Sequence, residues 1–101
     1  MTAIGDPENE VAVSAASIWE AEIKRVAGKL SIDVEPADEV GRSGFVPLAV
    51  TFEDAVGAAR LPPHHRDPFD RMLIAQARRH GMTLVTRDGR MADYGVAILP
   101  A

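Results

Sequence analysis

The segment from Asp67 to Thr86 constrains the fold most, because it contains both ends of a helix and the strand that follows it. Asp67 is a residue type that caps helix N-termini, and Pro68 suits the first helical position. Gly81 is the residue type that ends helices, and the apolar run Thr83–Thr86 then predicts a strand. A helix that leads into a short buried strand is typical of an α/β fold with a parallel sheet.

The rest of the chain repeats this alternation of strands and helices. Apolar runs predict three further strands, at Val11–Ser14, at Phe45–Val50, where Pro47 favours a sheet edge, and at Val96–Leu99. Trp19, Ile23, Val26 and Leu30 recur every three or four residues, which predicts one face of a helix after the first strand. Shorter helices are expected near Pro36, after Thr51, where Asp54 has capping-box spacing, and over Arg90–Tyr94.

Length and composition set the limits for fold and function. With 101 residues the chain forms a single domain over 1–101, and its 47% of apolar residues can build a core. It has no cysteine, no long apolar run and no apolar stretch near Met1 that would resemble a signal peptide. We therefore expect a cytoplasmic protein with no membrane contact. The net charge of −4 argues against tight nucleic-acid binding by bulk electrostatics.

Three acidic residues stand where an α/β fold exposes side chains to a ligand. Glu20 lies early in the first helix, Asp70 in the first turn after Pro68, and Asp88 directly after the strand ending at Thr86. Converging carboxylates with arginines beside them indicate a hard divalent cation that acts on a phosphate. Each acid also has a structural explanation. Glu20 completes a capping-box pattern that starts at Ser17, Asp70 suits the helix dipole, and Asp88 precedes a glycine in a turn.

Several neighbours are candidate helpers of these acids. Asp67 is explained by helix capping, while Thr86 and Arg87 could hold a water molecule or a phosphate oxygen. Arg71 either pairs with an acid or a phosphate, or is an ordinary surface arginine. The adjacent histidines His64 and His65 have no third ligand at zinc spacing, which disfavours a zinc site.

Trp19 and Phe69 are expected to be core anchors rather than stacking platforms for RNA bases, because aromatic residues make up only 5% of the chain.

Three segments in the same order resemble a PIN domain of the VapC toxin family. They are Ser14-Ala15-Ala16-Ser17-Ile18-Trp19-Glu20, then His65-Arg66-Asp67-Pro68-Phe69-Asp70-Arg71, then Leu84-Val85-Thr86-Arg87-Asp88. The resemblance covers nearly the whole chain, from about Asp6 onward. It implies a three-layer sandwich in which helices cover a parallel sheet.

This resemblance also implies a function. The family comprises the ribonuclease halves of type II toxin–antitoxin modules, which cleave RNA with Mg²⁺ or Mn²⁺. Glu20, Asp70 and Asp88 would then be the catalytic metal ligands, with Asp67 as a possible helper. The implied partners are an RNA substrate, a VapB-like antitoxin that inhibits the toxin, and a second copy in a homodimer.

One part of the family pattern has no match here. The pattern opens with a central strand that carries an aspartate, of the form Leu-Leu-Asp-Thr-His, and Met1–Asn9 does not contain it. We therefore expect the position between strands Val11–Ser14 and Thr83–Thr86 to lack its usual strand. Three explanations stay open: the chain starts further upstream, the chain is a remnant, or another chain supplies the strand.

Two other functions compete with the ribonuclease. A PIN-like domain with too few metal ligands would act only as a binding partner, for an antitoxin or for a toxin subunit. A response-regulator-like or phosphatase-like domain would also use an acidic pocket. That class needs an aspartate at the end of an early strand, where this chain has Ser14.

Overall fold

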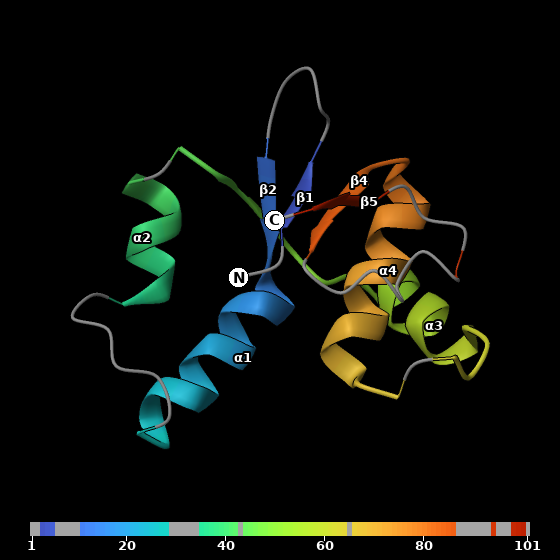
Figure 1. Ribbon diagram of the computed structural model, residues 1–101, viewed down its shortest axis with the longest axis horizontal. Helices are drawn as coiled ribbons and strands as arrows, with labels where there is room; N and C mark the ends of the chain where they lie inside the picture. The colour runs from blue at the N-terminus through green and yellow to red at the C-terminus, as the bar shows by residue number, and fades with distance from the viewer. Residues whose placement is uncertain are drawn as a thin grey trace.

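The computed structural model describes residues 3–5, 11–28, 35–42, 44–64, 66–86, 94 and 98–100. Within them the chain forms, in order, β1 (Ala3–Gly5), β2 (Val11–Ser14), α1 (Ala15–Val26), α2 (Pro36–Arg42), β3 (Val46–Leu48), α3 (Phe52–Arg60), α4 (Pro68–His80), β4 (Thr83–Thr86) and β5 (Ile98–Pro100). The strands form one sheet, with α1 and α2 to one side of it and α3 and α4 to the other (Figure 1). This arrangement confirms the predicted α/β class with helices on both faces. None of the helices in the described ranges is long and apolar enough to cross a membrane.

The sheet has the strand order β3-β2-β1-β4-β5. β2 pairs parallel to β3, and β4 pairs parallel to β5. β1 is antiparallel to both β2 and β4, so the other four strands all run in one direction. Their carboxyl ends therefore meet at one edge of the sheet, which is where α/β proteins bind their ligands. The edge position predicted for the strand around Pro47 is confirmed, since β3 is the outermost strand on its side.

The expected vacancy at the centre of the sheet is not found. β1 fills this position, with Ile4 opposite Ala12 on one side and opposite Leu84 on the other. The backbone groups of β2 and β4 must be hydrogen-bonded when buried, and an extended segment can satisfy them in either direction. The sheet is therefore mixed rather than wholly parallel. The sequence Ala-Ile-Gly of β1 contains no carboxylate, so the family's aspartate has no counterpart in this strand.

The ends of α3 and α4 form as predicted. The Asp67 carboxylate accepts hydrogen bonds from the backbone N–H groups of Phe69 and Asp70, at 2.9 and 3.2 Å. Gly81 ends α4 in the left-handed conformation, with φ 64°, which glycine adopts without steric cost. Thr51 and Asp54 form the capping box at the start of α3. Sequence-local signals therefore fix the limits of both helices.

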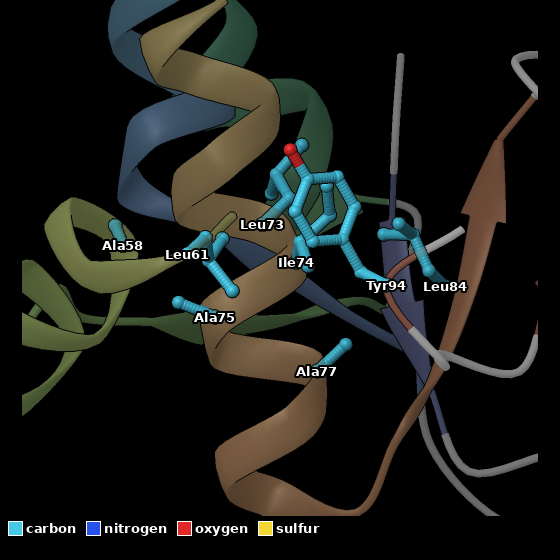
Figure 2. Packing of buried hydrophobic residues seen from close by; sticks show 8 residues of the cluster. All are labelled: Ala58, Leu61, Leu73, Ile74, Ala75, Ala77, Leu84 and Tyr94. Carbon is cyan, nitrogen blue, oxygen red and sulfur yellow. The ribbon is translucent and has the colours of Figure 1, made fainter. Parts of the chain in front are cut away.

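The core lies between α4, the end of α3 and the sheet (Figure 2). Leu73, Ile74 and Leu84 are almost completely buried, and Tyr94 closes the cluster from the C-terminal part of the chain. The Tyr94 hydroxyl donates a hydrogen bond of 2.7 Å to the Pro62 carbonyl. Full burial of each large aliphatic side chain contributes about 1.5–3 kcal/mol. α4 is therefore fixed to the sheet along its middle turns.

The apolar face of α1 is largely exposed, which corrects the prediction for Trp19. Small residues, Ala16 and Ser17, are the buried positions of this helix, whereas 64% of Trp19 and 80% of Val26 are exposed. Phe69 is half-buried, and its ring packs against that of Trp19 in a T-shaped arrangement with the ring centroids 5.2 Å apart. The spacing of apolar residues predicted the helix correctly. It did not show which of its faces the rest of the chain covers.

Candidate functional site

The candidate site lies where the second turn of α1 meets the first turn of α4. α1 begins directly after the carboxyl end of β2, and α4 begins at Pro68. The Trp19–Phe69 contact joins these two helices close to their starts. Glu20 and Asp70 are the next residues along the chain after Trp19 and Phe69. Two of the three predicted acids therefore lie on helix turns that contact each other.

Glu20 does not cap a helix, so the capping-box explanation for this residue is wrong. The N-cap of α1 is Ser14, whose hydroxyl oxygen accepts a hydrogen bond of 3.1 Å from the Ala16 amide. The helix thus starts three residues before the Ser17 that the capping pattern requires, and Glu20 falls in its second turn. The side chain is 30% exposed, with the Nζ atom of Lys24 at 3.8 Å from its Oε2 atom. Such an exposed pair is weak, and a metal ion could replace it.

Asp67 and Asp70 have different roles in the first turn of α4. Oδ1 of Asp67 is committed to the helix N-terminus, which supports its structural explanation. Asp70 is half-buried and lies in the first helical turn, where the helix dipole favours a negative charge. The capping carboxylate of Asp67 fixes the backbone of this turn, and with it the position from which Asp70 projects.

Arg71 binds backbone carbonyls in the part of the structure that is described. Its guanidinium donates to the carbonyls of Ala58 and Leu61 at 2.8 Å, to that of Pro62 at 3.1 Å and to that of Ala59 at 3.4 Å. These are carbonyls at the end of α3 and just beyond it, which have few partners within the helix. The residue proposed to contact an acid or a phosphate therefore acts as a clamp on the end of α3.

The remaining candidates lie partly or wholly outside the described residues. Asp88, Arg87 and His65 fall outside them, and Thr86 is described only by its place at the end of β4, paired with Pro100. The ring of His64 contacts that of Tyr94. Among the residues that are described, no three histidine, cysteine, aspartate or glutamate side chains form a group that could hold a metal ion. Of the three predicted acids, Glu20 and Asp70 are therefore among the described residues, whereas the role of Asp88 stays a prediction.

The donor set nonetheless has the right chemistry for a hard divalent cation. Mg²⁺ and Mn²⁺ prefer carboxylate oxygens, and Mg²⁺ commonly takes only one or two carboxylates, together with water and substrate phosphate. Glu20 and Asp70 supply two such groups on adjoining helix turns.

An apolar hollow of about 520 Å³ lies beside these turns, lined by Ala15, Ala16, Trp19, Val50, Pro68, Phe69 and Met72. Apolar surroundings strengthen electrostatic interactions at a neighbouring polar site.

Sequence reasoning missed a buried polar cluster around Asp54. The carboxylate is fully buried and accepts hydrogen bonds from the Thr51 amide at 3.0 Å, from Nε2 of Gln76 at 3.2 Å and from Nε of Arg79 at 2.6 Å. Burial alone would raise the pKa of Asp54, but the hydrogen bonds from Arg79, Thr51 and Gln76 outweigh it and lower this pKa to about 2. The capping-box spacing identified Asp54 as a cap, but nothing in the sequence linked it to α4.

The described elements define an α/β domain whose parallel strands all end at one edge of the sheet. The profile of the PIN domain matches residues 2–97, and the chain belongs to this family. PIN domains are generally nucleases and typically use divalent metals. No curated protein and no solved structure showed a significant match to the chain.

Proposed function

We propose that this PIN domain is a metal-dependent endoribonuclease, the VapC-type toxin of a type II toxin–antitoxin system. The observation that supports this most directly is the contact between Trp19 and Phe69. It brings together the helix turns that carry Glu20 and Asp70, at the edge of the sheet where the parallel strands end.

The chain's own residues would contribute in distinct ways. The carboxylates of Glu20 and Asp70, with that of Asp88 as the proposed third ligand, would hold Mg²⁺ or Mn²⁺. The bound ion would supply the positive charge that orients the scissile phosphate and activates a water molecule. Asp67 holds the first turn of α4 through two hydrogen bonds from the backbone, and so positions Asp70. Thr86 and Arg87 remain proposed neighbours of Asp88.

The proposal also implies partners and a location. The substrate would be RNA, a VapB-like antitoxin would inhibit the enzyme, two copies would form a homodimer, and the protein would act in the cytoplasm.

One observation favours a second candidate, a PIN-like domain that only binds its partners. β1 occupies the centre of the sheet and brings no carboxylate to it. The number of ligands could then be too small for catalysis, because a divalent ion needs enough oxygen donors to be held firmly.

Cleavage by the purified chain separates the two candidates. We expect total cellular RNA to be cut in Mg²⁺ or Mn²⁺ and to remain intact in EDTA. Asp70→Asn should abolish cleavage with little effect on thermal unfolding, because the substitution keeps the size of the side chain. The matched control is Asp38→Asn, which changes an exposed aspartate on α2 and should cut normally. Undiminished metal-dependent cleavage by Asp70→Asn would refute the assignment of this residue, and no cleavage by the unaltered chain would favour the binding-only candidate.

A further inference from the structure

A second hollow, distinct from the candidate site, opens between α3 and α4. It measures about 450 Å³ and is lined by Glu53, Gly57, Arg60, Leu61, Ala75, Arg78 and Arg79. Its floor consists of small residues, since Gly57 of α3 faces Ala75 of α4, and its rim carries three arginines. Figure 2 shows the side chains of Leu61 and Ala75 in the space between the two helices.

Two of the three arginines are available for a ligand. Arg79 is already paired with the buried Asp54, at 2.6 Å. Arg60 and Arg78 are exposed, and neither has an ion pair or hydrogen bond with any residue that the structure describes. Among the described residues that line the hollow, Glu53 is the one that is acidic. The hollow therefore carries a local positive charge on a chain whose net charge is −4.

Gly57 keeps the floor of the hollow open. A Cβ atom at this position would lie 3.6 Å from the Cβ atom of Ala75, which is an ordinary van der Waals contact. The approach of α3 to α4 therefore does not require a glycine. Glycine inside a helix is unfavourable relative to alanine, so the stability of α3 would gain from a side chain here. The absence of a side chain at Gly57 leaves room in the hollow for a group of the ligand.

We propose that this hollow binds the phosphodiester backbone of single-stranded RNA, next to the segment that is cut. Guanidinium groups recognise phosphate oxygens through paired hydrogen bonds. The inference rests on the proposed ribonuclease function. Helix α4 connects the hollow to the candidate site. Asp70 and Arg78 are eight residues apart on this helix, which is about 12 Å along its axis. A strand held at Asp70 could thus extend to Arg78. The arginines supply the local attraction that the acidic chain as a whole cannot.

Binding is tested by fluorescence anisotropy with a fluorescein-labelled 12-nucleotide single-stranded RNA in EDTA, where cleavage is suppressed. Relative to the unaltered chain, the double variant Arg60→Gln/Arg78→Gln should bind about tenfold more weakly at low salt. Its log–log salt slope should be smaller by about 1.4, because each phosphate contact to a single strand contributes about 0.7. The matched control is Arg25→Gln/Arg42→Gln, which removes the same charge from α1 and α2 and should change neither value.

Gly57→Ala provides a test that does not alter charge. The added methyl group should raise the midpoint of thermal unfolding through better helix propensity, and it should weaken RNA binding by narrowing the floor. Loss of binding together with gained stability cannot come from misfolding.

The inference is overturned if the arginine variant binds the RNA like its control, or if polyglutamate competes as well as RNA does. The latter result would assign the hollow to an acidic peptide. Cleavage in Mg²⁺ or Mn²⁺ is measured separately. If the chain cuts RNA while the arginine variant shows an unchanged KM, the inference fails and the proposed function stands. If the arginine variant loses RNA binding but the unaltered chain does not cut RNA, the proposed function fails, while the inference that the hollow binds RNA is supported.

Discussion

Replacing Asp54 by asparagine should destabilise the protein strongly and in a pH-dependent way. Lowering the pKa of this carboxyl from 3.8 to about 2 corresponds to about 2.4 kcal/mol of stability at neutral pH. Asparagine also presents an NH₂ group to a site where Thr51, Gln76 and Arg79 all donate. One buried donor is then unpaired, at a cost of about 1–3 kcal/mol that overlaps with the first figure. We expect a total loss of about 2–4 kcal/mol at pH 7.

The sign of the pH dependence follows from the direction of the pKa change. A carboxyl group with a lowered pKa in the folded state stabilises the protein fully above the unfolded value of 3.8, and this stabilisation disappears as the pH falls through about 2. The difference in unfolding free energy between the unaltered chain and Asp54→Asn should therefore shrink by about 2 kcal/mol between pH 6 and pH 2.

Urea unfolding followed by circular dichroism at several pH values measures this difference. The exposed Asp38→Asn is the matched control and should stay within about 0.5 kcal/mol of the unaltered chain at pH 7. A double-mutant cycle with Arg79→Met should assign a substantial coupling energy to the pair. If the difference in unfolding free energy between the unaltered chain and Asp54→Asn is the same at pH 6 and pH 2, Asp54 is not an ionised carboxylate stabilised by its buried hydrogen bonds.

Two further substitutions test the fold. Arg71→Met should lower the unfolding free energy by about 1–3 kcal/mol in urea, because it leaves carbonyls at the end of α3 without their donor. The exposed Arg66→Met should have little effect, and equal effects of both would contradict the clamp. Ile4→Pro removes a backbone donor from the central strand and should cost about 1–3 kcal/mol. An edge strand tolerates proline, as β3 does at Pro47, whereas a central strand does not. An unchanged midpoint of urea unfolding for Ile4→Pro would therefore show that β1 does not pair on both sides as described.

The parts of the fold that the sequence predicted are those determined by neighbouring residues. The caps at Asp67, Thr51 and Gly81 depend on hydrogen bonds and backbone angles within a few positions, and the strands followed from short apolar runs. The sequence left the N-cap of α1 open between Ser14 and Ser17, because both are suitable caps, and the structure shows that Ser14, at the end of β2, is the cap.

The parts that could not be predicted depend on contacts distant in sequence. The antiparallel strand β1 has a single residue of high β-propensity, Ile4, between an alanine and a glycine, and its place depends on the spacing between β2 and β4. The hydrogen bond that Arg79 donates to Asp54 joins residues 25 positions apart. For the candidate site, the sequence identified Glu20 and Asp70 by their place in helix turns. The contact between Trp19 and Phe69, which joins the two helices that carry these acids, is a tertiary contact that neither motif contains.

The central strand also has a consequence for how the sheet opens. β2 with β3 and β4 with β5 are two parallel pairs, and within the sheet β1 is the strand that connects them. It is paired with β2 at Ile4 and Gly5, and with β4 at Ala3, Ile4 and Gly5. β1 is a strand of three residues, and segments held by few contacts open with lower free energy than the core. Release of β1 would therefore divide the sheet into two halves, and amide hydrogens that β2 and β4 direct toward it should exchange with solvent well before those in the middle of α4.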